Sequence, residues 1–368
     1  MKKFAGVAQK VKTDVIGLDV HKDVIVFSHL DAQGDELHAG ELPSEAQKVI
    51  EAVHGLRDGR PVHVTLEASG GMLWLYDVLV AEFGEEFVHV VHPRFIRAIA
   101  QSPDKNDAND AYWLAHYTHE GRLRESWMPR GAVRELRIAI RGRHEAVRQR
   151  TRATLLLKSQ LRQMGVKLPG VRMDGDAVQA KVRELGATIP GMRGLALRVL
   201  LRRFEAAARD VETWDEAIAT LCADMPEVKK VQEHIPGVGK TLAAVIVAES
   251  GPVARFSTPK AYGKYTGMTP SDRSSGGRTI HGAMTRHGSP LLRWALLQAV
   301  MACLRGSREM GSGPRGAVAR WVDAKERRTG SRMKVRVAAA RKLANSIWWL
   351  FHQPEQFSAS KSFTPAGT

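Results

Sequence analysis

The chain has 368 residues, a length that predicts two or three domains of about 150 residues each. It contains 55 Lys and Arg against 39 Asp and Glu, so its formal net charge at pH 7 is +16. Such an excess indicates a polyanionic partner, either nucleic acid or an anionic membrane surface. The longest uninterrupted apolar run, Leu242 to Ala248, is far shorter than the ~18 residues that a membrane-spanning helix needs.

The start of the chain and its cysteines indicate a reducing compartment. The N-terminal MKKFAGVAQKVK is basic but has no apolar stretch after it, so we expect no secretory signal. Cys222 and Cys303 are far apart, and each lies in an apolar helical pattern. They cannot form a zinc cluster, so we interpret them as reduced core residues and predict a cytoplasmic protein.

Charge is distributed unevenly along the chain. Residues 1–112 contain 11 basic and 18 acidic residues, a net charge of −7, whereas residues 113–368 contain 44 and 21, a net charge of +23. This change predicts a domain boundary. An acidic segment repels a polyanion unless its charge is compensated, and a divalent metal ion is the usual compensation.

The first 121 residues have the pattern of an α/β domain. The expected strands are 15–20, 23–30, 36–42, 61–67 and 87–92, and the expected helices are 44–56, 72–83, 94–100 and 106–119. The first two strands are separated only by His21 and Lys22, which indicates a hairpin. Strands that alternate with helices after an initial hairpin predict a mixed sheet covered by helices.

Four carboxylates of this domain have the positions that a metal site requires. Asp19 lies on an apolar strand, Glu67 ends another strand, and Asp107 and Asp110 share one face at the start of a helix. Oxygen ligands of this kind suit one or two Mg²⁺ or Mn²⁺ ions. Alternatively, Asp107 and Asp110 only complement a helix dipole. Asp19 favours the metal site, because a carboxylate among apolar strand residues is costly unless it binds a ligand or is exposed at the sheet edge.

Residues 122–225 are predicted to be helical and strongly basic. Helices are expected over 132–164 and 192–222, joined by a connection of ~25 residues, which is typical of a coiled-coil hairpin that also serves oligomerisation. Between Arg122 and Lys167 there are 13 basic residues and 3 Glu. We therefore expect Arg141, Arg148 and Arg152 to contact phosphates; a solvated basic face without a specific partner is the alternative.

Residues 226–355 are predicted to form a mostly helical domain, which begins with a glycine-containing turn. The segment HIPGVGKTL (234–242) is not a phosphate-binding P-loop, because His234 stands where that motif needs its first glycine. The segment is typical of a helix–hairpin–helix turn, in which Gly237, Gly239 and Lys240 would hold a DNA phosphate. A simple turn between helices is the alternative.

Two segments further along the chain have the composition of irregular structure. Residues 270–278 are rich in Ser and Gly and predict a loop, in which a serine by itself carries no functional signal. The tail from about residue 356 is expected to be disordered.

Three strings in the first domain resemble a known family. They are IGLDVHK (16–22), LEASGG (66–71) and VHPRFIRAIAQSPDKNDANDA (91–111). They are similar to the N-terminal domain of DEDD-type insertion-sequence transposases of the one-hundred-ten family (IS110), which also includes related site-specific DNA invertases. The resemblance implies a RuvC-like, RNase H-like fold and a divalent metal held by Asp19, Glu67, Asp107 and Asp110. Asn106 is a departure, because the family usually has threonine there.

The C-terminal third resembles the second conserved domain of the same family. The matching strings are IPGVG (235–239), RFST (255–258), GMTP (267–270), SSGG (274–277) and RHGSPLLR (286–293). The resemblance implies that Ser275 is a nucleophile, although the adjacent Ser274 remains an alternative. Arg278, Arg286 and Arg293 then either stabilise the charge that develops on the phosphate or clamp the DNA backbone.

The leading hypothesis is therefore a DNA transposase that cuts and rejoins strands through a phosphoserine intermediate. The resemblance further implies a structured non-coding guide RNA and a homo-oligomer, either dimer or tetramer, with no membrane partner. One rival is a metal-dependent nuclease of the Holliday-junction-resolvase type, in which water is the nucleophile. The other is a non-catalytic nucleic-acid-binding protein. A membrane-surface protein is the weakest hypothesis, because no aromatic-rich face opposes the basic residues.

Overall fold

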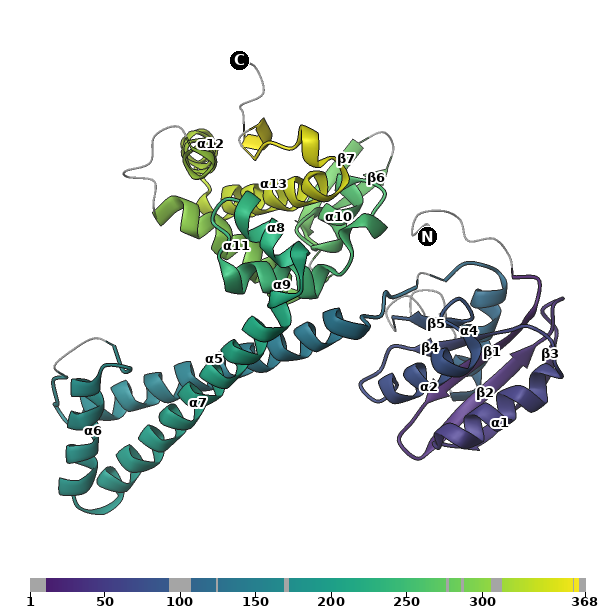
Figure 1. Cartoon of the computed structure of the whole chain (residues 1–368), viewed down its shortest axis with the longest axis horizontal. Helices are drawn as coiled ribbons and strands as arrows, with labels where there is room; N and C mark the ends of the chain where they lie inside the picture. Colours follow the sequence, from purple (N-terminus) through teal and green to yellow (C-terminus); the bar gives the residue numbers. More distant parts are fainter. Residues whose placement is uncertain are drawn as a thin grey trace. The chain divides into compact units, whose positions relative to one another are not determined.

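The computed structural model describes residues 11–92, 107–123, 125–168, 172–275, 278–285, 288–305, 313–359 and 361–363. The chain forms two compact units, and the boundary between them lies between Met128 and Pro129. Figure 1 labels the helices and strands of both units. Among the described helices, none is long and apolar enough to cross a membrane.

A five-stranded sheet forms the centre of the first unit. Its strands are β1 (Asp14–Val20), β2 (Val24–Leu30), β3 (Glu36–Pro43), β4 (Val62–Glu67) and β5 (Val88–Val91), in the order β3-β2-β1-β4-β5. The pairs β1–β2 and β2–β3 are antiparallel, whereas β1–β4 and β4–β5 are parallel. The predicted mixed sheet with an initial hairpin is confirmed, and the carboxyl ends of β1, β4 and β5 meet at one edge.

Alternation along the strands assigns their side chains to two faces. Ile16, Leu18 and Leu66 are buried under α1 (Ala46–Arg57) and α2 (Leu73–Phe83). The opposite face is covered by α4 (Asp107–His119), which packs mainly on β1 and β2. A hydrogen bond of 2.7 Å between the hydroxyl oxygens of Thr65 and Thr118 joins α4 to β4. The predicted helix at 94–100 and Asn106 lie outside the described residues.

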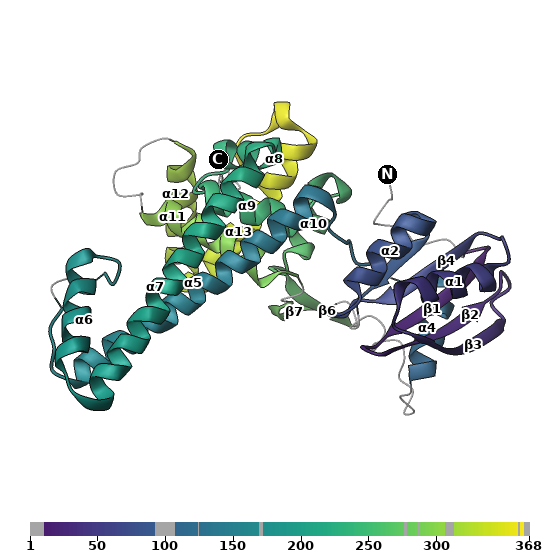
Figure 2. The same ribbon diagram turned by 60° about the horizontal axis from the view of Figure 1, so that its bottom comes forward.

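Two long antiparallel helices, α5 (Gly131–Gln163) and α7 (Gly191–Ala223), begin the second unit. They lie side by side over most of their length (Figure 2). Towards the middle of α5, Arg143 pairs with Asp215; near its end, Leu157 shares a core cluster with Leu201. The predicted helical hairpin is therefore confirmed. The connection between the two helices, for which the sequence predicted only a length, contains a further helix, α6 (Asp176–Thr188), which buries Val178 and Val182.

The rest of this unit is a bundle of α8 (Pro226–His234), α9 (Lys240–Ser250), α10 (Pro259–Tyr265), α11 (Pro290–Arg305), α12 (Pro314–Thr329) and α13 (Arg332–His352). Short 3-10 turns flank it at Val253–Arg255, Pro354–Gln356 and Lys361–Phe363. Cys303 is buried in its core and Cys222 is half-buried, and neither forms a disulfide. The prediction of reduced core cysteines is thus confirmed for Cys303.

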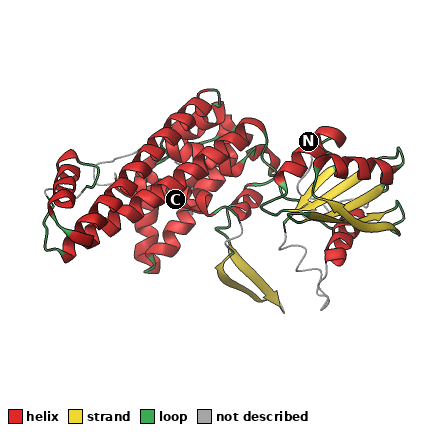
Figure 3. Ribbon diagram, turned by 90° about the horizontal axis from the view of Figure 1, so that it is seen from below, coloured by secondary structure: helices red, strands yellow, loops and turns green. Residues whose placement is uncertain are grey.

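The Ser/Gly-rich segment is a hairpin and not the predicted loop. Strands β6 (Pro270–Ser275) and β7 (Arg278–Met284) pair antiparallel, and they form the only two-stranded sheet among the described residues of this unit (Figure 3). Composition was misleading here because polar residues can also form a ladder through backbone hydrogen bonds.

The end of the chain also differs from the prediction of a disordered tail. Phe363 is buried, and its ring meets Trp321 of α12 edge to face. The ammonium of Lys342 donates a 2.8 Å hydrogen bond to the carbonyl oxygen of Ser362. Phe363 therefore packs on the helical core, and residues 364–368 of the predicted tail lie outside the described residues.

A buried ion cluster ties α5 to α9. Glu249 is fully buried, and Arg137 and Arg141 donate hydrogen bonds of 2.9 to 3.2 Å to its carboxylate. Burial by itself would raise the pKa of Glu249, but the two guanidinium groups outweigh it and hold the pKa below its ordinary value. This cluster fixes the base of the long hairpin to the helical bundle.

Candidate active site

The close approach of α4 to β1 determines where the acidic residues lie. Gly17 faces α4, and a Cβ at this position would overlap the carbonyl oxygen of Ala111. Only glycine permits this contact, which brings the first turn of α4 to the carboxyl end of β1. Asp19 follows two residues after Gly17 on the same face, so the sequence of β1 directs its carboxylate towards Asp107 and Asp110.

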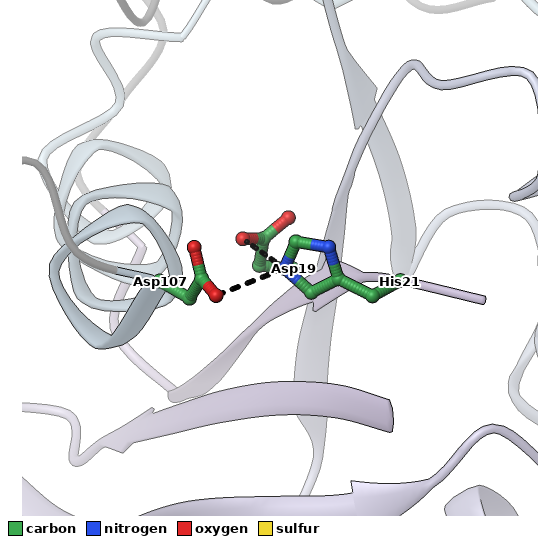
Figure 4. A group of neighbouring side chains, drawn as sticks. All are labelled: Asp19, His21 and Asp107. Carbon is green, nitrogen blue, oxygen red and sulfur yellow. Dashed lines mark hydrogen bonds and ion pairs between the residues drawn. The ribbon is translucent and has the colours of Figure 1, made fainter. Parts of the chain in front are cut away.

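Asp19, His21 and Asp107 form the centre of the candidate site (Figure 4). The Nε2 atom of His21 lies 3.1 Å from Oδ2 of Asp19 and 3.5 Å from Oδ2 of Asp107. One donor atom from each of the three side chains lies within 4.8 Å of the other two. Asp19 is 8% exposed and Asp107 is exposed, so the site is open on its α4 side.

The electrostatics of Asp19 are unusual for a carboxylate. Burial raises its pKa above the ordinary value, and Asp110 and Asp107 raise it further, whereas His21 opposes them. Three like charges that converge in this way destabilise the charged form of Asp19. A divalent cation would relieve this repulsion, so the cluster has the chemistry of a metal site.

Glu67 lies on the strand next to Asp19. The parallel register pairs Leu18 with Leu66, so Glu67 follows at the level of Asp19, and it pairs with Val91 on the other side. Val91 packs against Leu114 of α4, which places Glu67 on the α4 face of the sheet. Its carboxylate is not one of the three grouped donors described above. The structure therefore brings Asp19, Asp107 and Asp110 together and places Glu67 at the same edge.

Sequence reasoning missed His21, which was interpreted as part of a turn. In the structure its backbone N–H donates a 3.0 Å hydrogen bond to the carbonyl of Val24, which closes the turn, while its imidazole extends between two carboxylates. The alternation of extended backbone carried the signal: Asp19 and His21 are two residues apart, so both side chains point to one face.

The predicted nucleophile lies in the second unit, at the end of a strand. Ser275 is the last residue of β6 and pairs with Arg278, the first residue of β7. Ser274 pairs with Thr279, one step further from the hairpin end. The backbone therefore brings Ser275 and Arg278 together, while Arg286 lies outside the described residues.

The other arginines predicted to contact nucleic acid either bind a partner within the protein or are exposed. Arg293 on α11 donates a 2.8 Å hydrogen bond to the carbonyl of Gly288. Arg141 binds the buried Glu249, and Arg148 pairs with Glu145 at 3.0 Å. Arg152 is exposed on α5. The guanidinium of Arg141 is thus engaged within the protein.

The two glycines in the turn between α8 and α9 have different roles. Gly237 is buried with a φ of +77°, and a Cβ there would overlap the carbonyl of Ala299 on α11. Gly239 and Lys240 are exposed at the start of α9, and a Cβ at Gly239 would meet nothing. Gly237 therefore serves packing, whereas Gly239 and Lys240 leave the helix N-terminus accessible.

Two family models match the chain in the regions that contain these sites. One, described as the Transposase IS116/IS110/IS902 family, matches residues 230–312, and a DEDD-type transposase model of IS110 matches residues 16–166. The chain belongs to the IS110 family of transposases. It is therefore an enzyme of DNA transposition, which cleaves and rejoins DNA.

Known transposases are similar to this IS110-family chain over nearly its whole length. The transposase for insertion sequence element IS1328 of Yersinia enterocolitica is 25% identical, over 94% of this chain and 98% of the relative. The transposase for IS1111A of Coxiella burnetii is 23% identical, over 93% and 91%. A probable family 20 transposase of Pseudomonas aeruginosa is 24% identical, over 91% and 96%. Both units of this transposase thus have counterparts in its relatives.

Proposed function

We propose that this transposase cuts and rejoins DNA through Ser275, with a divalent ion held by Asp19, Glu67, Asp107 and Asp110. The observation that carries the proposal is the convergence of Asp19 with Asp107 and Asp110. Burial raises the pKa of Asp19, and the two neighbouring carboxylates raise it further. Such a perturbed carboxylate cluster is typical of functional sites. Mg²⁺ or Mn²⁺ bound there would stabilise charge on phosphate oxygens.

The serine step is a transesterification. The Oγ of Ser275 bonds to the phosphorus of a DNA phosphodiester, its proton leaves to a base, and the bond from phosphorus to one deoxyribose oxygen breaks. The released DNA end takes up a proton as a hydroxyl. Attack by a hydroxyl of another strand reverses the exchange and frees the serine, so bond energy is conserved. Arg278, opposite Ser275 in the hairpin, is suited to the charge on the phosphate.

The proposal also covers the roles of the domains, a guide RNA and the oligomeric state. Residues 1–121 form the RuvC-like catalytic domain, 122–225 the coiled-coil region and 226–355 the domain with the serine. The sheet order with an initial antiparallel hairpin supports the RNase H-like assignment. A guide RNA and a homo-oligomer complete the proposal, supported by the long basic helix α5 and by exposed apolar side chains such as Leu155 and Met192 on the hairpin. Arg148 and Arg152 on α5, with Lys240 on α9, are proposed to contact phosphates.

A strand-exchange assay with trapping of covalent protein–DNA adducts tests the serine mechanism. Ser275→Ala should lose both adduct and product, while Ser274→Ala, the matched control, should retain the adduct. Full recombination by Ser275→Ala would overturn the mechanism, and loss of the adduct only in Ser274→Ala would transfer the role to the neighbouring serine.

A metal nuclease of the resolvase type is the second candidate, because the carboxylate cluster is built entirely within the first unit. That function predicts DNA cleavage by wild type without any covalent adduct, and cleavage that survives in Ser275→Ala. The adduct assay therefore separates the two functions with the same two variants.

A further inference from the structure

Among the three grouped side chains of the acidic site, His21 is the one that is not a carboxylate. It lies just beyond β1, and its backbone is held from two directions: its N–H donates to Val24, and its carbonyl accepts a 3.2 Å hydrogen bond from the hydroxyl of Ser44. The imidazole itself is 47% exposed. Its position is therefore fixed by the hairpin, while its ring remains accessible to a ligand.

Three atoms that can bind a cation converge around Nε2 of His21. Two carboxylate oxygens face this nitrogen, at 3.1 and 3.5 Å. A hydrogen on Nε2 would be shared between them, whereas the tautomer with its hydrogen on Nδ1 turns a lone pair of Nε2 towards both carboxylates. In that tautomer three lone pairs face one point, and a cation there would satisfy all three.

The spacing of the donors matches ligands on one ion. Two ligands at right angles on an octahedral Mg²⁺, each about 2.1 Å from the metal, lie about 3.0 Å apart. The separations of 3.1 and 3.5 Å from Nε2 to the two carboxylates are close to this value. Small side-chain rotations would bring all three atoms onto one ion, because His21 and Asp107 are both exposed.

We propose that Nε2 of His21 is a ligand of the divalent ion held by Asp19 and Asp107, and that this nitrogen makes the site prefer Mn²⁺ over Mg²⁺. The inference rests on the proposed carboxylate site and extends it by one ligand and a metal preference. Mg²⁺ favours oxygen ligands and near-ideal octahedral geometry, whereas imidazole raises the affinity for transition metals.

Pulsed electron paramagnetic resonance of full-length protein with Mn²⁺ provides the direct test. Wild type should show coupling of bound Mn²⁺ to a nitrogen nucleus, and His21→Gln should lose it. His54→Gln is the matched control, because His54 also binds a carboxylate, that of Glu82 at 2.7 Å, but on α1, away from the site. The nitrogen coupling should persist in that control.

Metal titrations give a second, independent measure. His21→Gln should weaken Mn²⁺ binding by at least about tenfold and Mg²⁺ binding by less. His21→Asp replaces the nitrogen by oxygen, so Mg²⁺ binding should persist while the preference for Mn²⁺ falls. Circular dichroism verifies that both variants are folded.

The outcomes separate this inference from the proposed function. Mn²⁺ bound to wild type without nitrogen coupling, or coupling that persists in His21→Gln, would overturn the role of His21 alone. Unchanged metal binding in Asp19→Asn would overturn the carboxylate site itself, and the role of His21 with it.

Discussion

The surroundings of two buried carboxylates of this transposase shift their pKa values in opposite directions. Glu249 in the second unit accepts hydrogen bonds from Arg137 and Arg141, and its pKa is lowered. Asp19 in the first unit is buried beside Asp107 and Asp110, and its pKa is raised. Its two arginine partners make Glu249 a structural link, whereas the neighbouring carboxylates of Asp19 add to the cost of its charged form.

The largest expected effect is a loss of stability on removal of Glu249, the buried partner of two arginines. Glu249→Ala leaves Arg137 and Arg141 without their buried partner, so the free energy of unfolding of the second unit should fall by about 3–5 kcal/mol. Denaturant titration measures this loss. The control is Asp215→Ala, which removes the more exposed pair with Arg143 and should cost less than about 1 kcal/mol. Equal losses in both variants would refute the contrast.

Gly17→Ala tests whether the close packing of α4 on β1 brings Asp107 and Asp110 to Asp19. The added Cβ overlaps the backbone of α4, so the helix must shift and stability should fall by about 1–3 kcal/mol. Metal affinity should fall as well, because Asp107 and Asp110 move with α4. Gly55→Ala in α1 is the matched control, since a Cβ there meets nothing and the helix should gain up to about 1 kcal/mol. Unchanged metal binding in Gly17→Ala would contradict this account of the site.

Glu249 should also make the stability of the protein depend on pH in the acid range. Because the folded pKa of Glu249 is lowered, its contribution is present above its ordinary pKa of about 4.5 and is lost as pH falls through the folded value. Thermal unfolding of wild type should therefore show a decline below about pH 4.5 that Glu249→Gln lacks. An identical acid decline in both proteins would show that other groups cause it.

The smallest effect is expected at Asp19, with the opposite sign. Its folded pKa is raised, so at neutral pH the charged form costs stability, and without metal Asp19→Asn should slightly raise the melting temperature. Added Mn²⁺ should then raise the melting temperature of wild type but not of the variant. A lower melting temperature for metal-free Asp19→Asn would mean that the charge is already compensated.

Much of the site was predictable because it follows local patterns. Alternating apolar residues define β1, β2 and β4, so Asp19 and Glu67 could be placed near the ends of β1 and β4. Helical spacing could place Asp107 and Asp110 in the first turn of α4. The motif strings around them were also sufficient to indicate the family. The hairpin β6–β7 was missed, because its strands are rich in polar residues and lack the apolar alternation that predicts a strand.

The sequence by itself determined the strands and helices of the first domain, the two long helices, the charge asymmetry and the family, since these are carried by neighbouring residues. Tertiary structure decided which side chains meet. Arg141 resembles any other arginine on a basic helix until Glu249, on α9, is placed against it. His21 resembles a turn residue until α4 packs on Gly17 and brings Asp107 to its imidazole. Contacts between residues far apart in the chain depend on how whole elements pack, which no local pattern records.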